Sequence, residues 1–269
     1  MTTPPFSAAH RGGAGRPLVL LHGFIDTWRT WELVLPALER HHEVLAPTLV
    51  GHAGGPALPQ DGVALDAALA DAVERAMDEV GWETADVVGN SLGGYVGLRL
   101  AERGRARSVV ALAPAGGWPV GDPAVEQTHA HFATMDELVK AAAPHADAIV
   151  ATAEGRWRAT LATAERFEHI PAELLAHQIR GAAACAATAP LVEHARGAGW
   201  RVDAERIDCP VRIVWGTEDR LLRWPDAAAR FREEWLPHAD WVVLDGVGHC
   251  PQLDVPLETA ELILGFTRR

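Results

Sequence analysis

The sequence predicts an α/β protein with a mostly parallel central sheet, helices on both faces of that sheet and an inserted all-helical segment. Short apolar runs alternate with helical patterns over residues 16–114 and again after residue 209. The predicted strands are apolar at nearly every position, as expected of parallel strands that are covered on both sides. No convincing strand pattern occurs over residues 118–203. We therefore expect one interrupted domain, with an α/β core over residues 1–117 and 204–269 and a helical lid insertion over residues 118–203.

The first part of the core shows the alternation of strand and helix most clearly. The first fifteen or so residues contain glycine and proline without periodicity, so we expect a loose lead-in. Strands are then predicted at "RPLVLLHGF", "HEVLAPTLVG", "ADVVGN" and "ARSVVALAP", with helices at "TWELVLPALER" and "SLGGYVGLRLAERG" between them. A further helix is predicted before the third of these strands, because one helical stripe contains Leu65, Leu69, Val73, Ala76 and Val80.

The predicted insertion contains only helical patterns. Val125, Phe132 and Val139 recur at helical spacing, and Pro144 interrupts that pattern. Further helical patterns cover residues 149–167 and 174–187. The core then resumes with the strand "CPVRIVWGTEDR", a helix near residues 225–234, the strand "DWVVLDG" and a closing helix near residues 257–267.

Composition and charge exclude several classes of protein. With 48% hydrophobic and 22% charged residues, the chain is expected to be globular, and no apolar run approaches the roughly 20 residues of a membrane span. The net charge of −12 argues against binding to nucleic acid or anionic lipid. No secretory signal is visible at the N-terminus, so a cytoplasmic protein is expected, either a monomer or a homodimer. The three cysteines are irregularly spaced, which favours reduced thiols and shows no zinc pattern.

A glycine-framed serine is the strongest chemical signal in the sequence. The chain has only three serines and one asparagine, yet Asn90 and Ser91 are adjacent in "VVGNSLGGYVG". Gly89 to Gly93 fits the pattern G-x-S-x-G and lies between a predicted strand and a predicted helix. Such a tight turn forces the serine into strained backbone angles and leaves no room for side chains two positions away. The arrangement predicts a nucleophile elbow with the Ser91 hydroxyl at the N-terminus of a helix.

A serine nucleophile needs a base and an acid that orients the base, and both are available later in the chain. His249 lies in "GVGHCPQLD", a glycine-containing loop after the last predicted strand. Asp219 follows the preceding strand in "IVWGTEDRLL", with Glu218 as the nearest competitor for the role of the acid. Ser, acid and His then occur in the chain order of the elbow-containing hydrolases.

An oxyanion formed during acyl transfer needs backbone N–H donors that are already in position. The segment "LLHGF" follows the first clear strand, where we expect the Phe24 amide to be one donor. The Leu92 amide, directly after the nucleophile, is the expected second donor. His22 is expected to support this loop rather than to transfer protons.

With these motifs in place, the chain resembles the α/β-hydrolase superfamily, in the lid-bearing branch that contains esterases, lactonases, perhydrolases and carbon–carbon bond hydrolases. The resemblance spans about residues 16–269 and is based on "LHGF", "GNSLGG", "GTEDR" and "GHCPQLDVP". It implies Ser91 as nucleophile, Asp219 as acid and His249 as base, with Phe24 and Leu92 at the oxyanion positions. It also implies that no metal or organic cofactor is required.

The nucleophile narrows the choice of branch. Haloalkane dehalogenases and epoxide hydrolases resemble the chain in layout but have an aspartate where this chain has Ser91. Meta-cleavage-product hydrolases share "GNS", but they usually have a glycine-rich stretch after the oxyanion loop and a tryptophan after the histidine; here the sequence reads "HGFIDTW" and "HC". A serine hydrolase of carboxylic esters or related acyl bonds of small apolar substrates is therefore favoured. A carbon–carbon bond hydrolase or lyase, and a ligand receptor without turnover, remain as alternatives.

The helical insertion is expected to fold over the carboxyl end of the sheet and to determine substrate choice. Trp28 and Trp31 are expected mainly to pack at the start of a helix, and Cys250 to border the pocket and react with thiol reagents. Expected substrate-binding residues are Trp28, Trp118, Phe132, Met135 and Trp157, and further candidates for the cavity wall are His129, Phe167 and His177.

Overall fold

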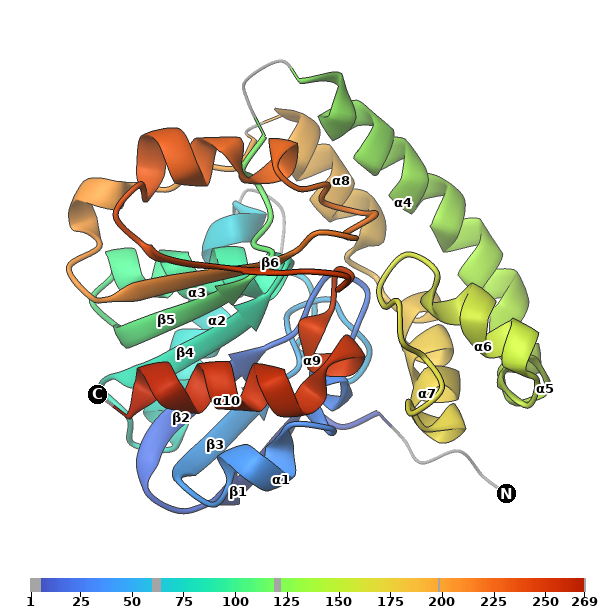
Figure 1. The fold of residues 1–269 in the computed structure, drawn as a ribbon, viewed down its shortest axis with the longest axis horizontal. Coiled ribbons are helices and arrows are strands. Elements are labelled where there is room, and N and C mark those ends of the chain that lie inside the picture. The colour runs from blue at the N-terminus through green and yellow to red at the C-terminus, as the bar shows by residue number, and fades with distance from the viewer. Residues whose placement is uncertain (1–5, 60–63, 119–121, 198, 269) are drawn as a thin grey trace.

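The computed structural model describes residues 6–59, 64–118, 122–197 and 199–268. The side chains of Val125 and His129, both named above, lie outside the described part. The seven-stranded sheet has the order β1-β3-β2-β4-β5-β6-β7, and all pairs are parallel except β1 with β3 (Figure 1). The strands are β1 (Ala9–Gly13), β2 (Arg16–Leu21), β3 (His42–Pro47), β4 (Ala85–Asn90), β5 (Ala106–Leu112), β6 (Val211–Gly216) and β7 (Asp240–Leu244).

The expected loose lead-in is wrong, because its second half forms the edge strand β1. This strand pairs antiparallel with β3, from Ala9 opposite Pro47 to Gly13 opposite Glu43. Its side chains are exposed or half-buried, so it has none of the apolar character of a central strand. Backbone pairing holds it in place, and that pairing leaves no hydrophobic pattern in the sequence.

Each central strand supplies side chains to two cores, one on each face of the sheet. Successive residues of β2 show this, since Leu18 packs in one core and Val19 in the other. Helices α2 (Leu65–Glu79) and α3 (Leu92–Glu102) cover one face, and α1 (Leu35–Leu38) and α10 (Pro256–Thr267) cover the other (Figure 1). This arrangement confirms the predicted α/β layers and the near-continuous apolar strands.

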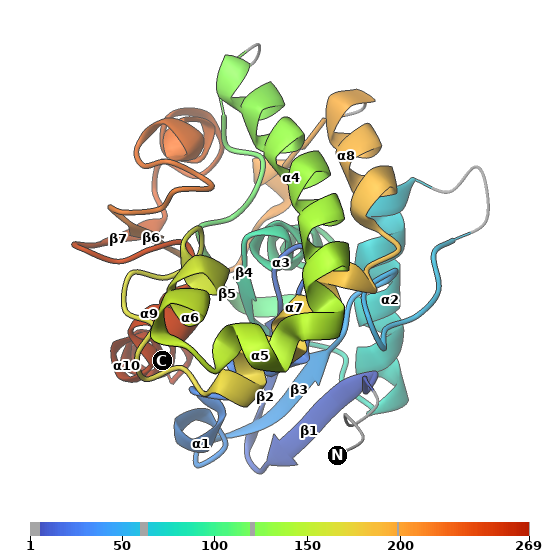
Figure 2. The same cartoon turned by 90° about the vertical axis from the view of Figure 1, so that its right-hand side faces the viewer.

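Among its described residues 122–197, the segment between β5 and β6 contains helices joined by turns and loops, and no strand. Figure 2 shows these helices grouped together beside the strand ends. The long pattern predicted over residues 149–167 is two short helices, since the Thr152 hydroxyl caps a new helix by accepting the Gly155 amide. The helices are α4 (Pro123–Ala142), α5 (Ala146–Val150), α6 (Ala153–Thr160), α7 (Ala172–Ala183) and α8 (Thr188–Gly197), the last of which was not predicted.

Two other predicted helices are shorter than expected. The segment after β2 forms a 3-10 helix, Trp28–Trp31, followed by the single-turn α1. The segment near residues 225–234 forms a 3-10 turn, Asp226–Ala228, and a π-helical turn, Phe231–Trp235. The short helix α9 (Pro251–Asp254) directly follows the loop that contains His249.

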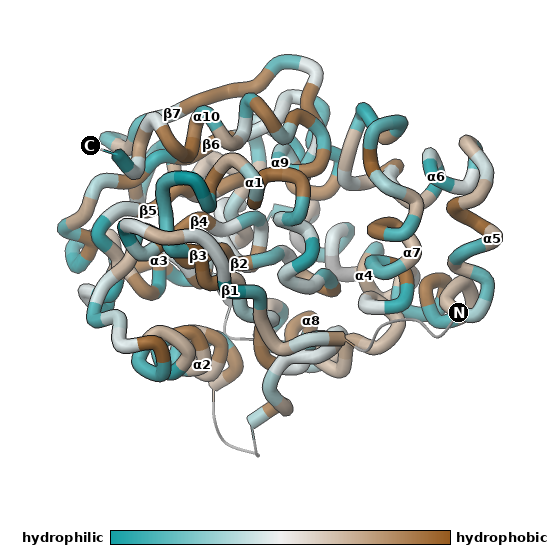
Figure 3. The backbone as a smooth tube through the Cα atoms, turned by 90° about the horizontal axis from the view of Figure 1, so that it is seen from below, coloured by the Kyte–Doolittle hydropathy of each residue, from teal (hydrophilic) through white to brown (hydrophobic). Residues whose placement is uncertain are grey.

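No helix in the described ranges is both long and apolar enough to cross a membrane. The hydropathy colours in Figure 3 agree, because polar and apolar residues alternate along the covering helices.

The pairing register of the central strands aligns their carboxyl ends at one edge of the sheet. Leu21 of β2 pairs with Gly89 of β4, and Asn90 pairs with Leu112 of β5. Leu112 in turn pairs with Val214 of β6. The loops that follow these strands therefore meet at one edge of the sheet, which is where ligands bind in open α/β sheets.

Candidate active site

Ser91 occupies a strained turn between β4 and α3. Its backbone has φ 52° and ψ −114°, a region that residues with a side chain rarely adopt. A Cβ on Gly89 would lie 2.1 Å from the Gly93 carbonyl oxygen, and a Cβ on Gly93 would lie 2.1 Å from the Leu21 carbonyl oxygen. Both glycines are therefore required sterically, and the structure supports the reason given for the G-x-S-x-G pattern.

Strain is concentrated at this edge of the sheet. Within the described residues, the other non-glycine positions with positive φ are Ile25, at 58°, and Ala113, at 42°. Ile25 directly follows Phe24, and Ala113 directly follows β5. Strained residues persist where the surrounding structure fixes them, and they cluster at functional sites.

His249 and Asp219 form a buried hydrogen-bonded pair. The distance between His249 Nδ1 and Asp219 Oδ2 is 2.7 Å, and both side chains are almost fully buried. The other carboxylate oxygen of Asp219 accepts the Leu221 amide at 2.9 Å and the Leu222 amide at 2.7 Å. Glu218 is exposed, so of the two predicted carboxylates it is Asp219 that faces the imidazole.

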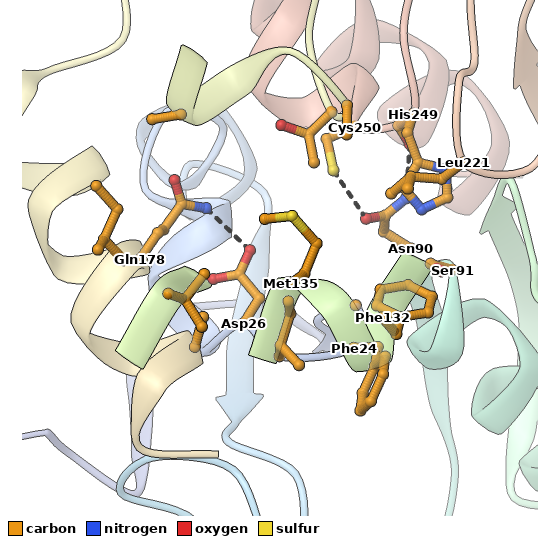
Figure 4. A pocket seen from close by; sticks show the side chains of 18 of the residues that line it. Phe24, Asp26, Asn90, Ser91, Phe132, Met135, Gln178, Leu221, His249 and Cys250 are labelled. Carbon is orange, nitrogen blue, oxygen red and sulfur yellow. Dashed lines mark hydrogen bonds between the residues drawn. The ribbon is translucent and has the colours of Figure 1, made fainter. Parts of the chain in front are cut away.

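Ser91 and His249 line the same cavity, of about 150 Å³ (Figure 4). No hydrogen bond joins the Ser91 hydroxyl to the imidazole within the part of the chain that the structure describes. Such bonds are often long in unliganded enzymes and shorten when substrate binds. The structure thus brings the three predicted residues to one site, while their catalytic roles remain predictions.

The loop that contains His249 is held by the helical insertion. Asp254, at the end of α9, accepts the Gly248 amide at 2.6 Å and the Arg166 amide at 2.7 Å. The Cys250 amide donates to the Thr163 carbonyl at 2.8 Å. The position of the imidazole therefore depends on the segment between α6 and α7 as well as on the core.

Asn90 connects the serine turn to the histidine loop. Its Nδ2 donates to the His249 carbonyl at 3.0 Å and to the Leu112 carbonyl at 3.2 Å. Its Oδ1 accepts Gln252 Nε2 at 3.2 Å and the Cys250 thiol at 3.3 Å. These contacts all lie in the core, and they join the Ser91 turn to the loop that contains His249.

The Phe24 and Leu92 amides lie where the sequence predicted an oxyanion hole. Leu92 is the first residue of α3, and Phe24 follows β2. Neither amide donates to another group in the described ranges, so both are free to bind a ligand oxygen. His22 supports the loop, because its Nε2 accepts the Leu49 amide at 2.8 Å and its Nδ1 lies 2.7 Å from the Gly23 carbonyl. Burial lowers the pKa of His22 well below its usual value, with His52 adding to the effect, so the ring is neutral.

The hollow around Ser91 has two compartments. Phe24, Ser91 and Phe132 border both, and the rings of Phe24 and Phe132 meet edge to face with centroids 4.7 Å apart. The second compartment, of about 50 Å³, is almost entirely apolar and is bordered by Trp118. Met135 lines the first compartment. Three of the five predicted substrate-binding residues therefore lie in the cavity walls, and their contact with substrate stays a prediction.

Trp28 and Trp157 lie outside both compartments, contrary to expectation. Trp28 Nε1 donates to the Ser7 hydroxyl at 2.7 Å, and its ring stacks on His10, which turns it toward the N-terminal strand. Trp157 is 47% exposed. Ala159 lines the cavity from the same helix, and residues two apart on a helix point in different directions.

Two of the further lid candidates also have structural positions. Phe167 packs in a small core between α5, α7 and the histidine loop, outside the cavity. His177 Nε2 lies 3.0 Å from the Thr27 hydroxyl, and burial lowers its pKa to about 4.

Sequence reasoning missed several polar residues in the cavity wall, namely Asp26, His131, Thr163 and Gln178. Asp26 lies two residues after Phe24, in a loop whose other cavity-lining residues carry no charge. An acidic residue in such a loop was the available signal. Gln178 lies on α7 and gave no signal, because a polar residue is ordinary on a helix.

No group of three or more His, Cys, Asp or Glu side chains among the described residues is arranged to hold a metal ion.

Known proteins resemble this chain over most of its length. The model of the alpha/beta hydrolase family matches residues 18–262. The chain is 36% identical over 201 residues to the epoxide hydrolase EphH of Mycobacterium tuberculosis, covering 74% of this chain and 94% of that protein. It is 27% identical over 268 residues to 2-hydroxymuconate semialdehyde hydrolase of Pseudomonas sp. strain CF600, covering 96% and 88%. It is 32% identical over 274 residues to pimeloyl-[acyl-carrier protein] methyl ester esterase of Aromatoleum aromaticum, covering 93% and 98%.

The chain therefore belongs to the alpha/beta hydrolase family. The fold predicted from the sequence is confirmed by this match and by the observed sheet.

Proposed function

We propose that this protein is a serine hydrolase that cleaves a carboxylic ester, or a related acyl bond, of a small and largely apolar substrate. One observation carries the proposal: the strained Ser91 turn and His249, which is hydrogen-bonded to Asp219, border a single cavity. The relatives support hydrolysis in general, and one of them is a methyl ester esterase.

In the proposed first step, His249 Nε2 removes the Ser91 proton while the Ser91 oxygen attacks the acyl carbon. Asp219 holds the imidazole through Nδ1 and stabilises the cation that forms. The two amides on its other oxygen fix the direction of the carboxylate.

The tetrahedral intermediate places a negative oxygen near the Phe24 and Leu92 amides. Both residues border the small apolar compartment beside Ser91, so their amides are in position in advance and stabilise the charge without reorganising. His249 then gives its proton to the departing alcohol. The same imidazole then takes a proton from water as the water oxygen attacks the acyl-enzyme. The bond to the Ser91 oxygen breaks, the carboxylic acid leaves, and His249 gives the proton from water to the Ser91 oxygen.

Serine at the nucleophile position argues against epoxide opening by the same route. Attack of the Ser91 oxygen on an epoxide carbon would form an ether, which lacks a carbonyl for water to attack. A carboxylate nucleophile would instead form an ester that water can hydrolyse. The relation to EphH therefore supports the hydrolase class and leaves the bond type to be tested.

Carbon–carbon bond hydrolysis is the second candidate, because 2-hydroxymuconate semialdehyde hydrolase matches 96% of this chain. Another relative is named for a heptadienoate, which is a carboxylate substrate. The described cavity wall contains no lysine or arginine and does contain the carboxyl of Asp26. Such a wall binds an anionic substrate poorly, so an uncharged ester fits it better.

The proposal is tested with short-chain aryl esters and the variant Ser91→Ala, with Ser7→Ala as the matched control at an exposed serine. We expect Ser91→Ala to lower kcat/KM by several orders of magnitude and Ser7→Ala to leave it unchanged. Equal rates in wild type and Ser91→Ala would contradict catalysis and favour a ligand receptor. Cleavage of a vinylogous diketone acid with no cleavage of esters would favour the second candidate.

A further inference from the structure

The cavity has a second polar end, away from the catalytic serine. Figure 4 shows Asp26 and Gln178 side by side on one wall, with Met135 between them and the Ser91 region. Asp26 comes from the loop after β2 and Gln178 comes from α7, so the pair joins the core to the insertion. Gln178 Nε2 donates to Asp26 Oδ2 at 2.9 Å.

Asp26 is a half-buried residue whose carboxyl group lines the cavity without a cationic partner among the described residues. Its Oδ1 accepts the Thr27 amide at 2.8 Å, and the Thr30 hydroxyl also bonds to the carboxyl. No basic side chain in the described ranges pairs with it. Burial raises the pKa of Asp26 to about 6, against the lowering effect of these hydrogen bonds. An unpaired acid in this position costs stability, so packing alone does not explain it.

Gln178 leaves a second acceptor unused. Gln178 is half-buried, and the hydrogen bond found for its side chain among the described residues is the one from Nε2 to Asp26, which leaves Oε1 open to the cavity. The pair therefore offers acceptor oxygens to the cavity and no free cation. A ligand group that donates hydrogen bonds, and above all a positively charged one, is complementary to this end.

Apolar side chains line the same cavity, and Figure 4 shows Met135 between this end and the Ser91 region. A substrate that reaches both must therefore have an apolar middle section. The lining residues of that section are Met135, Val139, Leu175, Ile179 and Ala182.

We propose that Asp26 and Gln178 form a recognition site for a hydrogen-bond donor at the end of the substrate remote from the cleaved bond. The preferred donor is a protonated primary amine, and a hydroxyl is the next best. The inference rests on the proposed function, because it assigns a substrate class to the same cavity. The amine supplies the cation that the carboxylate of Asp26 lacks.

The first experiment compares aryl esters whose acyl chains match in length and end in a methyl, hydroxyl, ammonium or carboxylate group. In the wild type we expect kcat/KM to be highest for the ammonium ester, about tenfold above the methyl ester, and lowest for the carboxylate ester. Asp26→Asn should remove the preference for ammonium while retaining activity on the methyl ester. Gln178 can rotate its amide to bond with the new side chain, so the fold is preserved.

Glu173→Gln is the matched control, because it also removes one negative charge from the wall-forming region on α7 and its side chain is 80% exposed. We expect it to keep the ammonium preference. The same ranking of the four esters in wild type and Asp26→Asn would overturn the proposal, and so would the absence of any ranking in the wild type. Either result would leave ester hydrolysis itself intact.

A binding experiment separates this proposal from catalysis. Calorimetry compares the Ser91→Ala protein with the double variant that also contains Asp26→Asn. For each protein it measures the affinity for a primary alkylamine and for the alkanol of equal length. Tighter binding of the amine, lost by about tenfold or more with Asp26→Asn, would support the site even if no ester is turned over. Equal affinity in the two proteins would contradict it.

Discussion

At the residue scale, the geometry of the candidate site depends on a few atoms that each have two or more partners. Asp219 shows this best, because one oxygen is used by two backbone amides and the other by His249. The carboxylate can therefore neither rotate nor move away from the imidazole. A change of one atom at this position should alter chemistry while leaving packing unchanged.

Asp219→Asn is the corresponding prediction. The amide oxygen can still accept the Leu221 and Leu222 amides, but its NH₂ group then faces His249 Nδ1 and forces the ring proton onto Nε2. That tautomer cannot accept the Ser91 proton, so we expect kcat to fall by about 10⁴. Ester hydrolysis by Asp219→Asn measures this, with Glu218→Gln as the neighbouring exposed control. A loss smaller than tenfold would mean that another group orients the base.

The pKa of Asp26 predicts a pH-dependent stability. Its pKa rises from 3.8 to about 6 on folding because the carboxyl is buried. Between about pH 4 and pH 6 the folded protein therefore retains a proton that the unfolded chain has lost, so the free energy of unfolding falls as pH rises. Asp26→Asn removes this dependence. We expect the wild type to lose up to about 3 kcal/mol relative to the variant between pH 4 and pH 7.

Urea unfolding of both proteins across this pH range gives the difference directly, because the other titrating groups are common to both. Parallel stability curves would contradict the raised pKa.

Cys250 is predicted to be chemically inert, although it borders the cavity. Burial raises the pKa of its thiol well above the usual value, the nearby carboxyl groups of Asp26 and Asp219 add to the effect, and the thiol donates to Asn90 Oδ1. The reactive thiolate is therefore scarce at neutral pH. We expect iodoacetamide to leave Cys250 unmodified and activity unchanged, as read by peptide mass spectrometry. Rapid stoichiometric labelling of Cys250 would contradict this prediction and would agree with the reactive thiol expected from the sequence.

At the element scale, the turn between β4 and α3 should tolerate no side chain at its glycines. In Gly93→Ala the new Cβ would lie 2.1 Å from the Leu21 carbonyl oxygen and 2.7 Å from that of His22, so backbone must move. We expect the free energy of unfolding to fall by about 1–3 kcal/mol or more, and activity to fall with it.

Gly265→Ala in α10 is the matched control, because a Cβ there meets nothing within 4 Å. It should raise stability by up to about 1 kcal/mol, since alanine favours helix more than glycine does. Equal effects of the two substitutions in urea unfolding would show that the turn is less crowded than the structure indicates.

The elements that the sequence predicted are those with a strong apolar pattern. Strands β2 to β6 are central and largely buried, and α2 is amphipathic, so burial leaves a signal in the sequence. The edge strand β7 was still predicted because its sequence, DWVVL, is mostly apolar. The edge strand β1 was missed because its side chains face solvent and only its backbone pairs with β3. Helix bounds within residues 122–197 were less accurate, since short helices are ended by local caps such as Thr152.

At the scale of the whole molecule, distant loops meet because parallel strands end at the same edge of the sheet. Ser91, Asp219 and His249 could be predicted as one site for that reason, each being placed after a strand. The cavity wall could not, because it depends on how the helical insertion packs. Met135 faces the cavity from α4, whereas Trp157 on α6 faces solvent, and both were equally plausible from the sequence.

The insertion has two roles in the molecule. It supplies Phe132 and Gln178 to the cavity, and its residues 163–166 hold the loop of His249 through Cys250 and Asp254. Substrate recognition and the position of the base are therefore linked through one segment.

The most direct measurement is the intact mass of the protein, quenched during turnover of an aryl ester and followed by peptide mapping. The account predicts a mass increase equal to the acyl group, located on Ser91 and absent from Ser91→Ala. Turnover without any acylated protein, or with the acyl group on another residue, would contradict it.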